Sequence, residues 1–349
     1  MQILELPWLE ELLTSLPVHR DNLPQALLLA GRPGLGKRSV AMHLVKGMLC
    51  EAPGTRQIAC ATCVSCHLFA AGNHPDFRLL EIESEAADAD EPEAEDKAVA
   101  PKAGRRIISV DKIRSLADFA GMSAHRGRGK AIVIYTAEDM HPSAANAVLK
   151  ILEEPPPGTY FLLVSHQPDR LNATLRSRCF QLKIPTPAIA KVTDWLARMG
   201  GQDPELALAL ADQAPLEAMK LARDETFWVR RRHLFMRLAD SQFDPLKAAD
   251  AVEQADPTEV FRLLSQWVYD LVSVASGLDV RYNFDHKNDL GRLAQGTSGA
   301  LWFAWHRRLL QFGRSSQHPL NKRLALESLF TAYPVLPRAG RSSRASQGD

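Results

Sequence analysis

A short glycine-rich run near the start of the chain has the spacing of a phosphate-binding loop. The run is Gly31-Arg-Pro-Gly34-Leu-Gly36-Lys37-Arg38, which fits the pattern G-x-x-x-x-G-K. In such a loop the glycines let backbone N–H groups converge on phosphate oxygens, the lysine adds a positive charge, and the following helix offers its positive end. The apolar run before the glycines and the helix expected after them supply this context. The alternative interpretation is a plain strand-to-helix turn.

The loop lacks the residues that handle magnesium. In hydrolytic loops the position after the lysine is Ser or Thr, whose hydroxyl holds Mg²⁺, but here it is Arg38. Hydrolysis also needs an acidic residue at the end of a buried strand, and the candidate strand ends in Thr136-Ala137. We therefore expect no intrinsic ATP hydrolysis, while the retained lysine leaves binding of ATP or ADP open. The alternative is an active ATPase in which Glu138 or Asp139 replaces the missing acid through a bulge.

Four of the five cysteines stand close together in the pattern C-x9-C-x2-C-x2-C. They are Cys50, Cys60, Cys63 and Cys66, and four thiolates complete a closed tetrahedral site for structural Zn²⁺. Unmetallated thiols are one alternative. Attachment of a c-type haem is another, because Cys63-Val-Ser-Cys66-His67 also reads as C-x-x-C-H. Haem attachment needs export, and no basic stretch followed by an apolar run opens the sequence, so we expect a reducing, cytoplasmic location.

Composition and charge narrow the class of protein. The chain has 349 residues, of which 46% are hydrophobic and 24% charged, and its formal net charge is +1. This balance is typical of a globular protein with two or three domains. No strong overall field draws the chain onto nucleic acid, so any DNA contact must come from local patches. The sequence has no uninterrupted apolar segment of about 18 residues, so we expect no membrane span.

The first half of the chain alternates strand and helix patterns, which predicts a parallel α/β sheet. Residues 83–106 interrupt the alternation with an acidic, Ala-rich stretch that has no apolar periodicity, so we expect a disordered surface insertion. Beyond residue 184 helical patterns take over, among them a helix with Asp256 as N-cap and Gly277 as its stop. The five expected buried strands are residues 25–30, 77–82, 131–136, 160–165 and 179–184.

Further motifs follow the phosphate loop in a fixed order. The most specific is AANAVLKILEEPP at residues 144–156, which reads as a helix with a proline stop. Over about residues 1–335, the ordered motifs resemble the delta-prime subunits of the bacterial DNA polymerase III clamp loader, within the AAA+ superfamily. The other motifs are Pro7-Trp8-Leu9, the four-cysteine insert, His74-Pro75-Asp76-Phe77, Leu175-Arg176-Ser177-Arg178-Cys179 and residues 321–330.

The resemblance implies a fold and a domain organisation. The fold class would be α/β, with a parallel five-stranded AAA+ sheet domain at residues 1–184 that carries a zinc module at residues 50–66. A helical lid at residues 185–226 and an all-α collar domain for ring assembly at residues 227–335 would follow. The Ser/Arg/Gly-rich tail at residues 336–349 is expected to be flexible.

The resemblance also implies a function. The chain would be a non-hydrolysing subunit of a DNA-directed DNA polymerase (nucleotidyltransferase) holoenzyme that helps load the sliding clamp on primed DNA. Its partners would be the gamma/tau-type motor subunits and the delta subunit, with no membrane contact. Rival interpretations are an active AAA+ ATPase and a stand-alone zinc protein that contacts nucleic acid through its cysteine module.

Arg178 takes its implied role from the same resemblance. It would be an arginine finger that enters the ATP site of a neighbouring motor subunit, because its planar, always-charged fork can meet phosphate oxygens. The alternative is an ordinary surface arginine. A second basic feature is Arg126-Gly-Arg128-Gly-Lys130, which either touches DNA phosphates or is a solvated turn. We favour the solvated turn.

Overall fold

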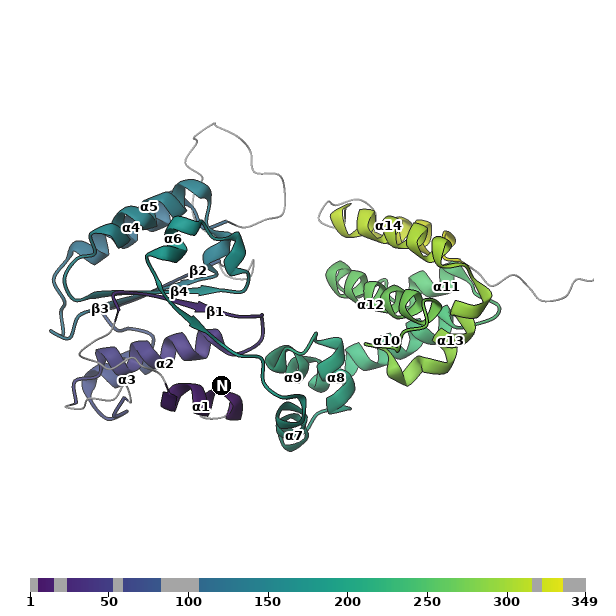
Figure 1. Ribbon diagram of the computed structural model, residues 1–349, viewed down its shortest axis with the longest axis horizontal. Coiled ribbons are helices and arrows are strands. Elements are labelled where there is room, and N and C mark those ends of the chain that lie inside the picture. Colours follow the sequence, from purple (N-terminus) through teal and green to yellow (C-terminus); the bar gives the residue numbers. More distant parts are fainter. Residues whose placement is uncertain (1–5, 16–23, 53–58, 83–106, 316–321, 335–349) are drawn as a thin grey trace, which may run out of the picture. The chain divides into compact units, whose positions relative to one another are not determined.

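The structure of the protein is a computed structural model, shown as a ribbon in Figure 1. The acidic insertion expected at 83–106 and the tail expected at 336–349 lie outside the residues that it describes. The described residues are 6–15, 24–52, 59–82, 107–315 and 322–334.

The chain divides into two compact units. The first contains the described residues up to Trp195 together with Ala214–Leu216. The second contains Leu196–Gln213 and the described residues from Glu217 onward. The finer division into a sheet domain, a lid and a collar stays a prediction.

The first unit is built on a parallel sheet of five strands in the order β2-β3-β4-β1-β5. Each of the five predicted strands is present, with bounds that differ from the prediction by one or two residues. The parallel sheet, followed along the chain by helices, confirms the predicted α/β fold class. The strands are β1 (Ala26–Ala30), β2 (Phe77–Glu81), β3 (Lys130–Tyr135), β4 (Thr159–Ser165) and β5 (Phe180–Lys183).

Helices cover both faces of this sheet (Figure 1). On one face lie α1 (Pro7–Ser15) and α2 (Lys37–Leu49), and on the other lie α4 (Val110–Gly121), α5 (Pro142–Glu153) and α6 (Ala173–Ser177). The inner strands β1, β3 and β4 are mostly apolar and buried because helices cover both faces of the sheet. The outer strands β2 and β5 are only partly buried, so the prediction of five buried strands is wrong for these two. The core beneath the second helix layer includes Leu28, Ile132, Ile134, Phe161, Leu163, Ile113, Leu116, Ala144, Val148 and Leu175.

The carboxyl ends of the parallel strands meet at one edge of the sheet. β1 leads into the glycine-rich loop, β3 leads into a short 3-10 helix, η3 (Ala137–Asp139), and β4 leads into His166. The backbone N–H of Gly31 donates to the carbonyl of Ser165 (3.3 Å) at this edge. Ligands of open α/β sheets bind at this edge, so the fold gathers the predicted phosphate and magnesium positions where a nucleotide would bind.

The described part of the second unit is helical. Its longest helix, α12 (Pro257–Ala275), has the predicted boundaries: Asp256 Oδ1 accepts from the N–H of Thr258 (2.7 Å), and the helix ends before Gly277. Gly277 has φ +76°, a left-handed conformation that favours glycine. The other helices are α8 (Pro204–Leu210), α10 (Glu225–Leu238), α11 (Pro245–Asp250), η5 (Phe284–His286), α13 (Lys287–Gly296), α14 (Gly299–Ser315) and α15 (Lys322–Thr331); α7 (Ile189–Met199) and α9 (Pro215–Arg223) cross the boundary between the units.

Tryptophans hold the core of the second unit. Trp267, Trp302 and Trp305 are fully buried. Trp267 Nε1 donates to the Tyr333 hydroxyl (3.0 Å), and Trp305 Nε1 donates to the carbonyl of Leu329 (2.9 Å). Trp267 belongs to α12, whereas Trp302 and Trp305 belong to α14, and these two helices pack against each other. In the part of the chain that the structure describes, no helix combines the length and apolarity needed to cross a membrane.

Candidate functional site

The glycine-rich loop joins β1 to α2, as its spacing predicted. Gly34 and Gly36 have φ +70° and +90°, and such left-handed backbone is strained for other residue types. Space is also short, because a Cβ atom added at Gly36 would lie 2.9 Å from Leu6 Cδ1 and 3.0 Å from Leu9 Cδ1. The glycine at position 36 therefore serves both the turn and the packing of α1 against it.

Lys37 is turned into its own loop. Its Nζ donates to the carbonyls of Gly31 and Arg32, both at 2.5 Å, and the residue is only 2% exposed. Burial lowers the pKa of Lys37 to about 8, an effect that the nearby Glu138 carboxylate opposes. To bind a phosphate, Lys37 would have to exchange its hydrogen bonds to these two carbonyls for hydrogen bonds to phosphate oxygens.

The N-terminal helix covers the middle of the loop. Trp8 Nε1 on α1 donates to the carbonyl of Leu35 (3.1 Å), and the Trp8 ring meets Trp195 edge to face, with 4.9 Å between the ring centroids. Leu35 and Gly36 are buried beneath this helix. The Pro7-Trp8-Leu9 motif is therefore part of the phosphate-loop region, a role that the sequence did not reveal.

Arg38 occupies the position of the missing magnesium ligand and is paired with a carboxylate. Its Nη2 lies 3.2 Å from Glu81 Oε1, and its Nε donates to Glu81 Oε2 (3.3 Å). Glu81 is the last residue of β2, at the same edge of the sheet as the loop. In a hydrolytic loop the residue at this position has a hydroxyl that binds Mg²⁺. In this chain the position holds a guanidinium, which forms a bidentate ion pair with Glu81.

The acidic residues after β3 are engaged locally. Glu138 Oε1 accepts from the backbone N–H groups of His166 (2.8 Å) and Gln167 (3.2 Å), so it ties η3 to the end of β4. Asp139 accepts the hydroxyl hydrogen of Thr136. Glu138 Oε2 is buried and has no hydrogen-bond partner among the described residues. In the alternative of an active ATPase, Glu138 or Asp139 would have to hold Mg²⁺ in addition to making these local hydrogen bonds.

The four clustered cysteines come together as predicted, at the end of α2 and the start of α3 (Val64–Ala70). Their sulfur atoms all lie within 4.8 Å of one another, with Cys50 Sγ 3.9 Å from Cys63 Sγ and Cys60 Sγ 4.0 Å from Cys66 Sγ. Four sulfurs about 2.3 Å from a central ion would be about 3.8 Å apart. The donors and their spacing thus fit one tetrahedral metal ion.

The cysteine cluster is joined to the basic loop, residues 126–130, through Glu51, which follows Cys50. Glu51 Oε1 accepts from Arg126 Nε (2.8 Å) and from the Ser65 hydroxyl (2.7 Å), and the carbonyl of Glu51 accepts from Arg128 Nη2 (2.6 Å). The hydrogen bonds from Ser65 and Arg126 hold the pKa of Glu51 below its usual range. Both arginines of the basic loop therefore anchor it to the cysteine module.

The rest of the basic loop is held by buried groups. Asp76 is fully buried and accepts from the backbone N–H groups of His125 (2.7 Å) and Arg126 (2.8 Å). Lys130 is 2% exposed and donates to the carbonyls of Phe119, Ala120 and Met122. The predicted solvated turn is wrong for Lys130, which belongs to β3 and is buried. The sequence does not reveal the anchoring role of Asp76, because its partners His125 and Arg126 lie about 50 residues further along the chain.

This anchoring predicts a structural role for the two arginines. Replacing both Arg126 and Arg128 with alanine should lower the free energy of unfolding by about 1–2 kcal/mol, since two charged hydrogen bonds are lost at partly exposed positions. Urea unfolding measures this change. The salt dependence of DNA binding by the assembled complex should stay the same. A slope lower by about two with unchanged stability would instead identify both arginines as phosphate contacts.

Arg178 lies at the opposite edge of the sheet from the chain's own phosphate loop. It follows α6 and precedes β5, whose first residue, Phe180, pairs with Leu27 near the start of β1. The phosphate loop follows the other end of β1, about four residues along at roughly 3.3 Å each. Arg178 is one-third exposed, and its Nη2 lies 2.6 Å from Glu153 Oε1.

Cys179, the fifth cysteine, is separate from the cluster of four. It is 7% exposed and belongs to the core beneath α4, α5 and α6. Burial raises the pKa of the Cys179 thiol to about 11, so it stays protonated and unreactive at neutral pH.

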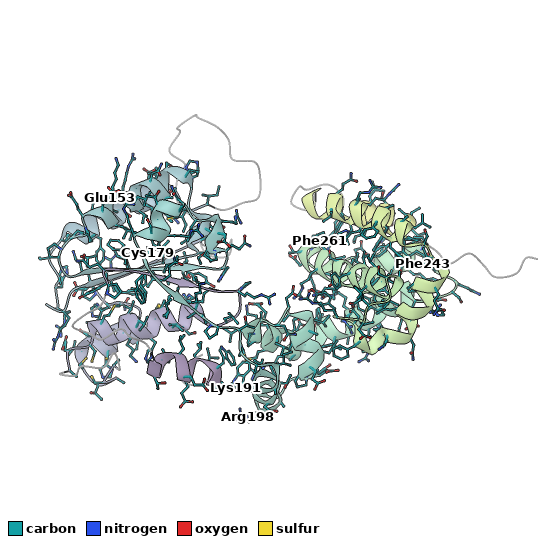
Figure 2. The ribbon with its side chains drawn as sticks, viewed as in Figure 1. Glu153, Cys179, Lys191, Arg198, Phe243 and Phe261 are labelled. Carbon is teal, nitrogen blue, oxygen red and sulfur yellow. The ribbon has the colours of Figure 1, made fainter. Side chains whose placement is uncertain are left out.

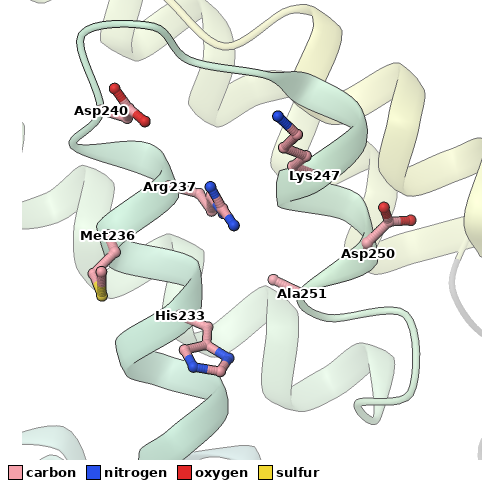
Figure 3. A pocket seen from close by; sticks show the side chains of 7 residues that line it. All are labelled: His233, Met236, Arg237, Asp240, Lys247, Asp250 and Ala251. Carbon is pink, nitrogen blue, oxygen red and sulfur yellow. The ribbon is translucent and has the colours of Figure 1, made fainter.

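A pocket of about 500 Å³ lies between α10 and α11 in the second unit (Figure 3). It is open and mixes basic and acidic side chains, without a cluster of one charge. None of the site residues predicted from the sequence is among those that line it, which are His233, Met236, Arg237, Asp240, Lys247, Asp250 and Ala251.

Comparisons with known proteins point to one family along the whole chain. A family described as DNA polymerase III, delta subunit, matches residues 9–188. The chain is 32% identical to DNA polymerase III subunit delta' of Pseudomonas aeruginosa over 96% of its own length and 98% of the relative. It is 33% identical to the Escherichia coli subunit of the same name, over 67% of this chain and 66% of the relative. Among solved structures, a DNA polymerase III gamma subunit-related protein of Thermotoga maritima is 17% identical, with a TM-score of 0.43, over 94% of this chain and 98% of the other.

Proposed function

The chain belongs to the delta-prime family of DNA polymerase III subunits, and we propose that it acts in the clamp loader of that polymerase as a subunit that hydrolyses no ATP itself. It would help to hold the clamp-loading ring together and would supply Arg178 to the ATP site of a neighbouring motor subunit. The assembly would then place the sliding clamp on primed DNA.

The observation that carries this proposal is the separation of Arg178 from the chain's own phosphate loop. Because Arg178 precedes β5 and the loop follows β1, they lie at opposite edges of one parallel sheet. An arginine so placed cannot reach a nucleotide held by its own loop, but it is exposed for a nucleotide held by a neighbour. Arginine fingers supplied from another subunit act in this way.

The state of the phosphate loop supports the absence of hydrolysis. Arg38 and Glu81 form an ion pair where a magnesium ligand would be required, and Lys37 is already bonded to loop carbonyls. ATP or ADP bound here would lack the loop hydroxyl that orients Mg²⁺. We infer that nucleotide bound to this chain is not consumed in its working cycle.

We also propose Zn²⁺ as the ion of the cysteine cluster. Cys50, Cys60, Cys63 and Cys66 offer four thiolates, which is the donor set of structural zinc sites. With all four positions taken, the ion has no open position for substrate, so its task is to hold the end of α2 and the start of α3 together.

The partners follow from the proposed role. They would be the gamma/tau-type motor subunits, whose ATP sites need an arginine, and the delta subunit, with sliding clamp and primed DNA bound through the complex. The helices from residue 227 onward would form the collar by which the subunits associate.

One experiment tests the proposal against an active ATPase. ATP turnover is measured for the chain alone, for motor and delta subunits without it, and for the full mixture with clamp and primed DNA. We expect no turnover by the chain alone and a DNA-stimulated rate that appears only in the full mixture. A Glu138→Gln variant should behave like the unaltered chain. Turnover by the chain alone that is lost in Glu138→Gln would show that Glu138 replaces the missing acid, and would overturn the proposal.

A further inference from the structure

The arginine motif holds two arginines, and each is paired with an acidic residue from a different element. Arg176 Nη1 lies 2.9 Å from Asp169 Oδ1, in η4 (Pro168–Arg170), which follows β4. Arg178 Nη2 lies 2.6 Å from Glu153 Oε1, at the end of α5. Glu153 and Cys179, the neighbour of Arg178, are labelled in Figure 2.

The backbone of Glu153 belongs to a helix that is packed on the sheet. Glu153 is the last residue of α5, next to Leu152, which is packed into the core, and a run of three prolines begins two residues later. Arg178, by contrast, caps the short helix α6 and extends a long side chain from it. An unpaired arginine of this kind samples many rotamers, and this freedom is lost when the side chain is ordered.

The pair leaves the guanidinium able to bind a phosphate. Of the five N–H donors of Arg178, one bonds to Glu153 and one to the carbonyl of Thr174 (3.3 Å). The remaining donors are available for phosphate oxygens. The contact with Glu153 therefore orients the Arg178 side chain and leaves N–H donors of the guanidinium for a phosphate.

The pair adds little to the stability of the fold. The side chains of Arg178 and Glu153 are 33% and 50% exposed. Ion pairs this exposed contribute little to stability, because solvent screens them and ordering two long side chains costs entropy. Placement matters far more to a catalytic group, since a misplacement of about 1 Å can reduce a rate by about 10²-fold.

We propose that Glu153 is a positioning residue that aims Arg178 at the nucleotide of the neighbouring subunit. This rests on the proposed role of Arg178 as an arginine finger. Glu153 does not itself touch the reacting phosphate; it acts through the direction that it gives to the guanidinium. Asp169, which holds Arg176, has no such task.

The test uses the full clamp-loader assembly with sliding clamp and primed DNA. The finger-dependent rate is the DNA-stimulated ATPase rate of the unaltered assembly minus that of the Arg178→Ala assembly. Glu153→Ala should reduce this rate by about tenfold or more through kcat, with little change in KM for ATP. Glu153→Gln keeps an acceptor oxygen in place and should recover most of the rate. The double variant Glu153→Ala/Arg178→Ala should lose no more than Arg178→Ala alone.

Two matched controls separate positioning from general damage. Asp169→Ala removes the partner of the other arginine, and Glu154→Ala removes a neighbouring acid that has no ion pair among the described residues. Both should keep the finger-dependent rate, and all variants should keep assembly and thermal stability close to those of the unaltered chain.

The outcomes separate the inference from the function on which it rests. If Arg178→Ala leaves the rate unchanged, the finger role itself is overturned. If Arg178→Ala reduces the rate but Glu153→Ala does not, the finger stands and the positioning role is overturned. A rate above that of the unaltered assembly in Glu153→Ala would also overturn the proposal, because Glu153 would then hold the finger back. An equal loss of rate in Asp169→Ala would also overturn the positioning role of Glu153. It would show that removing either acidic partner of the arginine motif reduces the rate.

Discussion

Replacing Arg178 with alanine is expected to reduce ATP turnover by about 10³-fold or more at the neighbouring site that we propose it serves. The reason is the charge that shifts onto phosphate oxygens in the transition state, which a rigid guanidinium stabilises and a methyl group does not. If Glu153 orients Arg178 as proposed, the guanidinium would lose little conformational entropy when it binds the phosphate. Steady-state ATPase of the assembly with clamp and primed DNA measures the change.

The matched control for this variant is Arg176→Ala, which removes the other arginine of the same motif. Arg176 is paired with Asp169 and has a side chain of similar exposure, so a loss of net positive charge alone would affect both variants equally. The Arg178→Lys assembly should also have a reduced ATPase rate, because an ammonium group cannot make the bidentate contact of a guanidinium with phosphate oxygens. Equal activity of the Arg178→Ala and Arg176→Ala assemblies would refute the finger.

The sequence could predict those parts of the site that residue type and local spacing decide. Gly36 stands in left-handed backbone that few other residues tolerate, so its position in the loop is readable from the pattern. Asp256 caps α12 through a bond that spans two residues. The cysteines come together because they are close in sequence. Two residues separate Cys60 from Cys63 and Cys63 from Cys66, and Cys50 directly follows α2.

The rest of the site depends on pairs that are distant in sequence. Arg38 meets a glutamate 43 residues away, and Arg126 meets Glu51 from a distance of 75 residues. Only the packing of strands and loops selects such partners, and many acids in the sequence could have served. The inward turn of Lys37 is also invisible to a pattern, because the glycine-rich motif is the same whether its lysine meets phosphate or its own carbonyls.

The basic loop shows how this limit affects a functional interpretation. A run of alternating arginine and glycine looks the same whether its charges meet DNA, solvent or a protein carboxylate. The buried Asp76 and the carboxylate of Glu51 decide the matter, and both belong to other segments of the chain. Net charge and the local motif therefore limit the possible partners of these arginines, and the folded structure determines which partner each one contacts.

Loss of the cluster's metal is expected to unfold the cysteine module and release the basic loop with it. Cys60→Ser should lower bound zinc from about one equivalent to near zero, because a structural site needs all four thiolates. Zinc binding contributes about 10–16 kcal/mol in isolated zinc-finger peptides, so the loss here should be on the order of several kcal/mol of local stability. The sheet has its own core and should keep its fold.

Hydrogen exchange in the basic loop is the more specific measure of metal loss. Glu51 follows Cys50 directly and holds Arg126 and Arg128, so its displacement should expose the backbone amides of residues 125–130. Hydrogen exchange in that segment should rise in Cys60→Ser and on removal of zinc by a chelator, and should rise less in the sheet. His67→Ala is the matched control, because His67 lies beside Cys66 on an exposed face and would be needed only for a haem ligand.

The contrary outcome is equally specific. If Cys60→Ser and the chelated chain both keep full protection at residues 125–130, the cluster does not hold the loop in place. The hydrogen bonds of Asp76 to His125 and Arg126 would then suffice alone, and Asp76→Asn should expose the same amides that metal loss leaves protected. With the metal in place, we expect Asp76→Asn to loosen the loop only in part, because Glu51 still anchors both arginines from the module.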